Sequence, residues 1–247
     1  MLKIALIGFG RMGQLLEKMA PQNNCEVIAK IDPQLGNEIS AKKLYDAEVC
    51  LEFSTPKAAY VNLKKLIKLK KNIIVGTTGW QDHFPELEKM VQQNKIGLVF
   101  GSNFSVGMNM FFQINQAIAK LMNNLENYDV LGYEMHHNRK QDSPSGTAIK
   151  LGNILLENID RKKKLQLDRL QRKIEPGELH FSSMRGGDIP GTHSIIYDSV
   201  ADSIELKHCA RNREGFALGA LKAAKWIKNK QGCYDFSDIF LQVLDKK

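Results

Sequence analysis

Short apolar runs alternate with segments of helical periodicity through the first hundred residues. Runs of four to seven apolar residues are typical of buried strands, whereas apolar residues spaced three and four apart indicate amphipathic helices. The pattern predicts strands at 2–7, 25–31, 49–53, 72–75 and 96–100, and helices at 14–20, 56–70 and 84–93. Such regular alternation predicts an α/β fold of the Rossmann type, with a doubly wound parallel sheet.

The pattern changes after residue 106. Helices are expected at 107–122, 147–158 and 215–228, and strands at 128–135, 179–184, 192–198 and 203–208. The last three strands are joined by short turns, which predicts an antiparallel meander. We therefore expect a smaller α+β domain with a largely antiparallel sheet over 107–215. Residues 1–106 and 216–247 should form the first domain, and only 161–176 reads as loosely ordered.

A glycine motif follows the first predicted strand. Gly8-Phe9-Gly10-Arg11-Met12-Gly13 has the G-x-G-x-x-G spacing between a strand and a helix, the context that a dinucleotide-binding loop requires. Asp32 ends the second strand, 19 residues past Gly13, and suits a hydrogen bond to an adenosine ribose. The alternative is a glycine-rich turn that only packs a helix on a strand. The motif predicts NADH or NADPH as cofactor.

Three later strands also end in small, hydrogen-bonding residues, at 53–56, 76–79 and 101–104. Each could be an ordinary turn before a helix cap. Ligands of doubly wound sheets bind beyond the carboxyl ends of the strands, so three such turns together indicate a nucleotide groove. The candidate cofactor-binding residues are Gly8, Phe9, Gly10, Arg11, Met12, Gly13, Asp32, Gly76, Thr77, Thr78, Gly101, Ser102, Asn103 and Phe104.

The segment from Glu134 to Ala148 gathers groups that bind anions and move protons. His136 and His137 can transfer protons near neutral pH, and Arg139 and Lys140 supply positive charge. The following Ser143-Pro144 reads as a helix start, with Ser143 or Asp142 as N-cap and Pro144 at the first helical position. Free backbone N–H groups of residues 145–147 would then favour a carboxylate or phosphate. The segment predicts a site for a small, doubly charged acid.

Composition narrows the class of protein. The chain has 247 residues, a formal charge of +8 and four scattered cysteines, as expected for reduced thiols in a cytoplasmic protein. No apolar stretch approaches the roughly 20 residues of a membrane span, and no secretory leader precedes the first strand. The lysines of 64–71 alternate with leucines at helical spacing, which favours a solvated helix face over nucleic-acid binding. Attraction of an anionic cofactor and substrate accounts for part of the charge.

With these motifs the whole chain resembles the 4-hydroxy-tetrahydrodipicolinate reductase family, formerly called dihydrodipicolinate reductase. The most specific similarity is Glu134-x-His136-His137-x-x-Lys140-x-Asp142-x-Pro144-Ser145-Gly146-Thr147-Ala148. Further similarities are the glycine motif, Gly76-Thr77-Thr78-Gly79, Asn103-Phe104-Ser105-x-Gly107, and Arg185-Gly186-Gly187 followed by Gly191-x-His193. The chain departs from the family in a nucleotide loop that is one residue shorter than in many members, and in Arg139 and Thr192.

The resemblance implies an NAD(P)H-dependent oxidoreductase of lysine and diaminopimelate synthesis that reduces 4-hydroxy-tetrahydrodipicolinate to tetrahydrodipicolinate, without a metal. It implies a homotetramer formed through the sheets of the second domain. His136 would donate the proton and Lys140 would assist, while His137, Gly146 and Thr147 would bind the substrate's carboxylates. The alternatives are that His136 is a buried structural histidine, that Lys140 is a surface lysine, and that Gly146 and Thr147 only cap the helix. Two rival functions remain, another NAD(P)-dependent dehydrogenase on the same two-domain plan, and a nucleotide-sensing binding protein.

Four further residues stay outside this expected site. His193 and His208 are interpreted as structural. Arg185 and Arg211 are left out of the site, as residues that could support the substrate pocket or the subunit contact.

Overall fold

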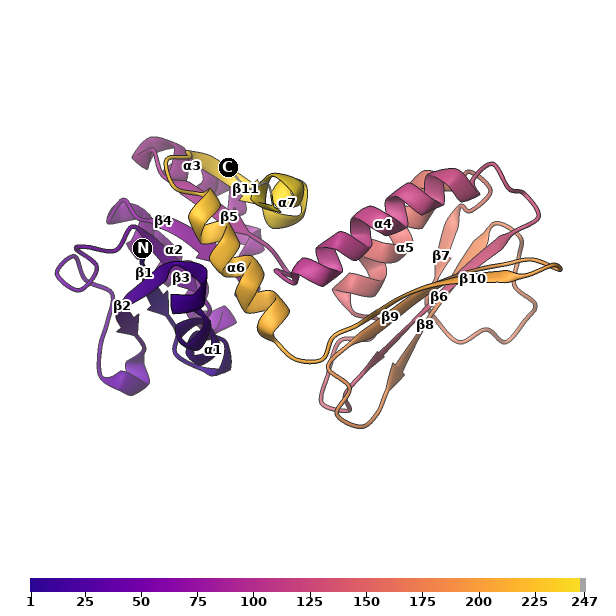
Figure 1. Cartoon of the computed structure of the whole chain (residues 1–247), viewed down its shortest axis with the longest axis horizontal. Helices are drawn as coiled ribbons and strands as arrows, with labels where there is room; N and C mark the ends of the chain where they lie inside the picture. Colours follow the sequence, from indigo (N-terminus) through magenta and orange to yellow (C-terminus); the bar gives the residue numbers. More distant parts are fainter. Residues whose placement is uncertain (245–247) are drawn as a thin grey trace. The chain divides into compact units, whose positions relative to one another are not determined.

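Two separate sheets organise the chain, one in each of two units (Figure 1). The computed structural model describes residues 1–244. The first unit is Met1–Val106 together with the chain from Arg213 onward, and the second is Gly107–Asn212. The chain thus re-enters the first unit at residue 213, three residues before the expected boundary at 216.

The sheet of the first unit has six parallel strands in the order β11-β5-β4-β3-β1-β2. The strands are β1 (Leu2–Ile7), β2 (Cys25–Ile31), β3 (Val49–Glu52), β4 (Asn72–Val75), β5 (Gly97–Phe100) and β11 (Gly232–Asp235). Because β1 and β3 are neighbours while the chain runs through β2 between them, the order of the strands reverses there. Such a reversal opens a crevice at the carboxyl ends of the two strands.

Helices cover both faces of this sheet. Alternate residues of β1 point to opposite sides, so Ile4 and Leu6 belong to one core and Ala5 and Ile7 to the other. The first core is closed by α1 (Arg11–Met19), α6 (Glu214–Trp226) and α7 (Phe236–Leu244), and the second by α2 (Pro56–Lys68) and α3 (Phe84–Asn94). This arrangement confirms the predicted doubly wound fold. Short 3-10 turns occur at η1 (Pro21–Asn23), η2 (Pro33–Leu35) and η3 (Gln81–His83).

The sheet of the second unit has the order β10-β9-β6-β8-β7 and is mixed. Its strands are β6 (Asp129–His136), β7 (Lys164–Gln166), β8 (Glu178–Arg185), β9 (Thr192–Asp198) and β10 (Ser203–Cys209). The pairs β6–β9 and β9–β10 are antiparallel, whereas β6–β8 and β7–β8 are parallel. Strand β7 lies in the segment that the sequence analysis expected to be loosely ordered.

The expected meander is therefore wrong in its first step, because β6 lies between β8 and β9. The connection from β8 to β9 crosses the end of β6 and is held there by backbone hydrogen bonds. The amide of His137 donates to the carbonyl of Ile189 at 2.8 Å, and the amide of Asn138 donates to the carbonyl of Gly187 at 3.3 Å. This crossing brings the glycine-rich connection against the His136-His137 segment.

Helices α4 (Val106–Met122) and α5 (Gly146–Asn158) pack on one face of the second sheet (Figure 1). Phe112 and Leu151 from these helices join Phe181, Ile195 and Tyr197 from the strands in one core. The residues that alternate with the core positions point to the other face, and they include the partly exposed Leu131 and Met184. Among the described residues 1–244, the helices that contribute to the core of the second unit are α4 and α5, which lie on the opposite face.

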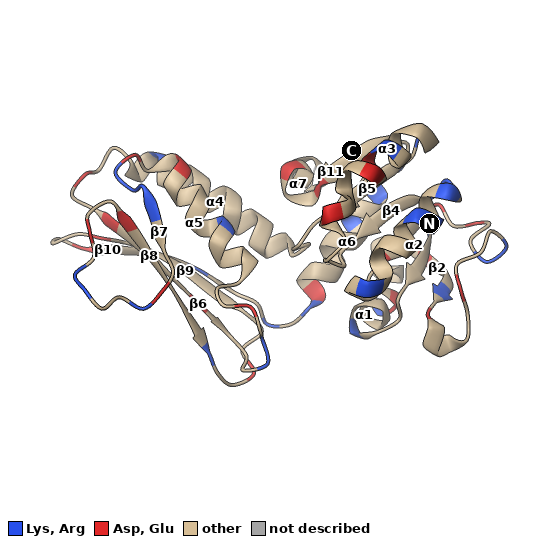
Figure 2. Cartoon of the chain, turned by 180° about the vertical axis from the view of Figure 1, so that it is seen from behind, with Lys and Arg blue, Asp and Glu red and all other residues tan. Residues whose placement is uncertain are grey.

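Charged residues are dispersed rather than gathered on one element. Figure 2 shows Lys and Arg on helices and loops of both units, including the lysines of α2. Within residues 1–244, no helix combines the length and apolar character needed to cross a bilayer.

Candidate active site

The glycine loop after β1 is shaped by two close backbone approaches. Gly8 has φ +90°, and a Cβ there would lie 2.4 Å from the carbonyl oxygen of Phe53. A Cβ on Gly13 would lie 2.4 Å from the carbonyl oxygen of Gly8. A Cβ on Gly10, in contrast, would meet nothing within 4 Å. Two of the glycines thus pack the loop against β3 and α1, and the third leaves space at the N-terminus of α1, where a phosphate can bind.

Asp32 connects the end of β2 to this loop. Its carboxylate accepts hydrogen bonds from the backbone amides of Phe9 at 2.7 Å and Gln34 at 2.9 Å. The backbone amide of Asp32 donates to the side chain of Asn37 at 2.9 Å. Asp32 is therefore held in place by groups of this chain, and a carboxylate in this position can also accept from ribose hydroxyls.

A cavity of about 500 Å³ lies beside the loop, a volume typical of small-molecule sites. It is lined by the ends of β1, β2 and β3 and the turn after β3, so it occupies the crevice where the strand order reverses. Among its lining residues are Gly8, Gly10, Asp32, Ser54 and Lys65. The open space at Gly10 and the placement of Asp32 fit the pyrophosphate and ribose of a dinucleotide.

The remaining candidate cofactor residues lie near the same sheet edge without lining this cavity. Phe9, Arg11, Met12 and Gly13 belong to the loop and the start of α1, while 76–78 follow β4 and 101–103 follow β5. Phe104 is buried and its ring packs 4.6 Å from that of Phe236, so its side chain belongs to the core of the first unit.

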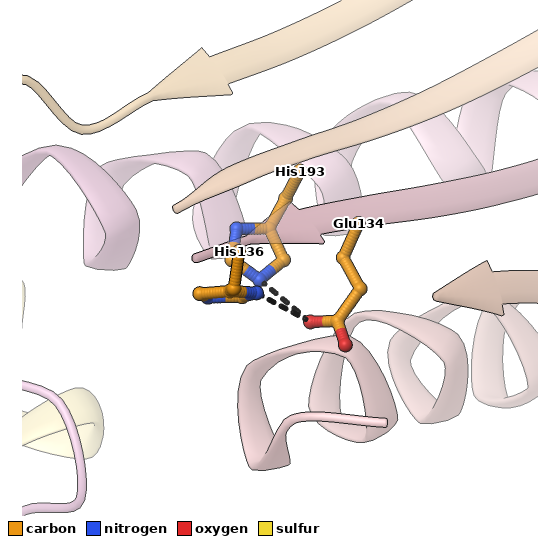
Figure 3. A group of neighbouring side chains, drawn as sticks. All are labelled: Glu134, His136 and His193. Atoms are coloured by element: carbon orange, nitrogen blue, oxygen red, sulfur yellow. Dashed lines mark ion pairs between the residues drawn. The ribbon is translucent and has the colours of Figure 1, made fainter. Parts of the chain in front are cut away.

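The second unit places a buried carboxylate between two imidazoles (Figure 3). Glu134 Oε2 lies 3.4 Å from His136 Nδ1 and 3.4 Å from His193 Nε2. Glu134 and His136 are two residues apart on β6 and so face the same side, and Glu134 is paired with His193 across β6 and β9. The three side chains are almost completely buried.

Four donors hold the carboxylate of Glu134. Arg185 Nη2 donates to Oε1 at 2.8 Å, Ser183 Oγ donates to Oε1 at 2.9 Å, and the amide of Ser145 donates to Oε1 at 2.9 Å. The hydroxyl of Ser145 donates to Oε2. Burial by itself raises the pKa of Glu134, but hydrogen bonds from His193, Ser145 and Arg185 outweigh it and hold the pKa well below its usual range. Glu134 is therefore ionised at neutral pH.

His136 is neutral at pH 7 in the free protein. Burial lowers its pKa to about 4; the carboxylate of Glu134 opposes that shift, and the positive charges of Lys140 and Arg185 add to it. A Cβ at Gly191 would lie 3.1 Å from His136 Nε2, so a side chain at Gly191 would crowd this nitrogen. An arriving dianion would favour the charged imidazole.

The segment after β6 places the other expected substrate residues. Strand β6 ends at His136, so His137 begins the loop and is not forced to the opposite face. The ammonium group of Lys140 pairs with the carboxylate of Asp142 at 2.7 Å. Gly146 is the first residue of α5, and Thr147 follows it.

The expected start of α5 is wrong. The N-cap is Ser145 and not Ser143 or Asp142, because the Ser145 hydroxyl accepts from the amide of Ala148 at 3.2 Å. The amide of Ser145 is also not free for a ligand, since it donates to Glu134. Gly146 and Thr147 stand in the first turn of α5, where the helix dipole favours an anion.

Glu134, His136 and His193 also form a possible metal-binding set. Their carboxylate oxygen and two imidazole nitrogens lie within 4.8 Å of one another, and zinc accepts such ligands. The same carboxylate, however, already accepts from Arg185 and from two serines. A guanidinium 2.8 Å from the carboxylate makes the surroundings better suited to protons and anions than to a divalent cation.

The expected site omitted four residues of this cluster: Glu134, Ser145 as a partner of Glu134, Arg185 and His193. Glu134 could have been found from strand alternation, since it lies two residues before His136. Arg185 and His193 could not, because their approach to Glu134 depends on which strands flank β6.

The comparisons with known proteins agree with the sequence motifs. Two sequence profiles match, described as dihydrodipicolinate reductase, N-terminus, over residues 2–104 and dihydrodipicolinate reductase, C-terminus, over residues 107–240. The chain is 37% identical over 238 residues to the 4-hydroxy-tetrahydrodipicolinate reductase of Christiangramia forsetii, covering 96% of this chain and 97% of the relative. It is 33% identical to the enzyme of the same name from Buchnera aphidicola, with 96% of each chain covered.

Solved structures show the same fold. A dipicolinate-bound dihydrodipicolinate reductase from Paenisporosarcina sp. TG-14 superposes with a TM-score of 0.76 at 21% identity, covering 97% of this chain and 99% of that one. An amine dehydrogenase from Mycobacterium smegmatis gives 0.61 at 12% identity, covering 96% of this chain and 95% of that one, which shows likeness of fold alone. The profiles and relatives span both units and confirm the resemblance found in the motifs. The chain belongs to the dihydrodipicolinate reductase family.

Proposed function

We propose that this protein is an NAD(P)H-dependent reductase that converts 4-hydroxy-tetrahydrodipicolinate to tetrahydrodipicolinate in lysine and diaminopimelate biosynthesis. The observation that carries the proposal is the buried His136, held beside Glu134 and followed by Lys140 and the N-terminus of α5. A proton donor, a cation and a helix N-terminus in one short segment suit a substrate with two carboxylates. The family membership supplies the identity of that substrate.

His136 is proposed as the proton donor. The reduced nicotinamide, when bound, supplies the hydride. Loss of the 4-hydroxyl group of the substrate as water gives a conjugated imine. Addition of a hydride to that imine leaves an electron-rich enamine, and a carbon of that enamine must then be protonated. His136 Nε2 lies next to Gly191, which has no side chain to crowd it, and an imidazole can carry the proton at this position.

Lys140, His137, Gly146 and Thr147 are proposed to bind the two substrate carboxylates. Lys140 now pairs with Asp142, so the substrate would compete with that carboxylate for the ammonium group. Gly146 and Thr147 begin α5, and Gly146 is open, because a Cβ there would meet nothing within 4 Å. An anion bound at these amides would gain from the helix dipole.

The cofactor cavity supports NADH at least as well as NADPH. Asp32 lines the cavity, and its carboxylate would accept from ribose hydroxyls and repel a 2′-phosphate. Pro33 follows it, where a cation could have bound that phosphate. Lys65 is the one lysine or arginine among the cavity's described lining residues, and it is the residue there that could bind a 2′-phosphate.

A homotetramer is proposed to form through the second sheet. The face opposite α4 and α5 carries Leu131 and Met184, which are 38% and 47% exposed, next to the partly buried Tyr133 and Ile196. An apolar sheet face of this kind is typical of a contact between subunits. Light scattering with size exclusion would test it, with Leu131→Glu expected to reduce the assembly size.

A cytoplasmic location is also proposed. All four cysteines are free, two of them buried, as is usual where thiols stay reduced.

A coupled assay tests the activity. Freshly generated 4-hydroxy-tetrahydrodipicolinate should cause oxidation of NADH by the purified protein, followed by the loss of cofactor absorbance. Binding of NADH without oxidation would favour a nucleotide-sensing protein. Oxidation with a keto acid and ammonia, but not with this substrate, would favour an amino-acid dehydrogenase.

A further inference from the structure

Glu134 takes no chemical step in the proposed function, although its carboxylate contacts many polar groups next to His136. It has no exposed surface, and its carboxylate contacts groups from four elements. These are His136 on its own strand β6, Ser183 and Arg185 on β8, His193 on β9, and Ser145 at the start of α5. A carboxylate held from so many sides cannot rotate away from His136.

The position of Glu134 distinguishes the two nitrogens of His136. Oε2 lies 3.4 Å from Nδ1, an ion-pair distance rather than an aligned hydrogen bond, while Nε2 lies on the other side of the ring, near Gly191. A carboxylate next to Nδ1 stabilises a hydrogen on that nitrogen and disfavours a lone pair there. Neutral His136 should therefore carry its hydrogen on Nδ1 and a lone pair on Nε2.

We propose that Glu134 is a positioning residue that fixes the Nδ1–H tautomer of His136, so that Nε2 is the nitrogen that gains and delivers the catalytic proton. The inference rests on the proposed function of His136 as proton donor. In each cycle Nε2 would take up one proton from the solvent, the proton that the reduction consumes, forming the imidazolium. It would then give that proton to a carbon of the reduced substrate, which returns the ring to its neutral Nδ1–H form.

Glu134 itself would stay ionised throughout this cycle. Arg185, Ser183 and Ser145 donate to it continuously, which holds its pKa low. The titratable and charged groups that face His136 are Glu134 on β6, Arg185 on β8, His193 on β9, and Lys140 with its partner Asp142 in the following loop. Of these, Glu134 is the anion in direct contact with the imidazole ring.

Nitrogen NMR of the histidine-labelled full chain tests the tautomer without any assay of activity. The expected result is a His136 signal typical of Nδ1–H, with its assignment made from the spectrum of His136→Gln. In Glu134→Gln the share of the Nε2–H form should rise and the pKa of His136 should fall. A wild-type His136 in the Nε2–H form would overturn the proposal, as would a Glu134→Gln spectrum with unchanged tautomer and pKa.

Kinetics supply the second readout. Glu134→Gln should lower kcat at least tenfold, as expected when the carboxylate that orients a catalytic histidine is lost, while the Kd for NADH stays within about twofold. Glu134→Asp keeps the charge and should recover part of the loss. If Glu134→Gln does not fold, Glu134→Asp with the same two measurements decides the question, because a shorter carboxylate should change the tautomer share and kcat together.

Glu178→Gln is the matched control. Glu178 is a second buried glutamate of the same sheet, and it accepts from Arg172 at 2.6 Å and Lys164 at 3.2 Å. Its replacement should leave the His136 tautomer and kcat unchanged. An equal loss of kcat in both variants would mean a general structural effect and would overturn the positioning role. Absence of reductase activity in the wild type would instead refute the proposed function. The NMR measurement would still report the tautomer of His136, because it does not depend on activity.

Discussion

The backbone amide of Phe9 donates a hydrogen bond to the carboxylate of Asp32, with a distance of 2.7 Å between the nitrogen and Oδ2. This contact joins the glycine loop after β1 to the end of β2, two segments 23 residues apart. It means that the residue expected to read the ribose also holds the loop expected to bind the pyrophosphate. A change at Asp32 should therefore affect both the choice of cofactor and the order of the loop.

We predict that Asp32→Ala shifts the preference toward NADPH, because the carboxylate that repels a 2′-phosphate is removed. The ratio of kcat/KM for NADPH to that for NADH should rise several-fold, and affinity for NADH should fall. Steady-state kinetics with both cofactors measures this ratio. Glu26→Ala, an exposed position on the same strand β2, should leave it unchanged. A wild-type kcat/KM for NADPH more than tenfold above that for NADH would contradict this account of the loop.

His136→Ala should lower kcat by roughly 10²-fold, the usual contribution of one general acid. The Kd for NADH should stay near that of the wild type, because His136 belongs to the second unit and the cofactor cavity to the first. Glu157→Ala, at an exposed position of α5, is a suitable control. Wild-type turnover in His136→Ala would remove His136 from the role of proton donor.

The stability of the protein should fall in mildly acidic solution because of His136. Burial lowers the pKa of His136 from 6.5 to about 4, so the unfolded chain takes up a proton that the folded chain does not. Stability is unaffected above pH 6.5 and declines as the pH falls toward 4, by about 3 kcal/mol in all. Thermal unfolding of His136→Gln should show a smaller loss of Tm between pH 7.5 and pH 5 than the wild type. Parallel losses in the two proteins would contradict the prediction.

Lys140→Ala should weaken the binding of a dicarboxylate inhibitor such as dipicolinate by about 1.5–3 kcal/mol, the usual value of a hydrogen bond to a charged group. Arg139→Ala removes the same charge from the neighbouring residue, which is exposed and pairs with Asp188 at 2.6 Å. It should cost less than about 1 kcal/mol. Calorimetric titration of both variants measures the difference. Equal inhibitor affinity in Lys140→Ala and the wild type would show that Lys140 does not contact a carboxylate.

The glycines of the nucleotide loop should separate into structural and ligand-facing positions. Gly13→Ala places a Cβ 2.4 Å from the carbonyl oxygen of Gly8, which should destabilise the first unit by about 1–3 kcal/mol. Gly10→Ala meets no protein atom within 4 Å, so it should leave Tm nearly unchanged and instead weaken NADH binding. Thermal unfolding and NADH titration of the two variants test this. A larger loss of Tm in Gly10→Ala than in Gly13→Ala would contradict the assignment.

The sequence by itself determined the elements and the chemistry that are local along the chain. Strands β1 to β5 of the first sheet were identifiable because an apolar run lies between helices of clear periodicity, whereas β11 was not predicted. The glycine loop and Asp32 were identifiable because their spacing is a local requirement of a strand, a turn and a helix. His136 and Lys140 stood out because they lie four positions apart in one short segment and their side chains carry the chemistry.

Only the tertiary structure decided which groups surround those residues. Strand β6 lies between β8 and β9, and that choice depends on pairing between strands far apart in sequence, which local periodicity does not encode. The pairing brings Arg185 to Glu134 across 51 residues and places His193 beside the same carboxylate. The N-cap of α5 is Ser145, whose amide and hydroxyl both donate hydrogen bonds to the carboxylate of Glu134. Side-chain partners across a sheet follow from register, and register is fixed by the packing of the whole unit.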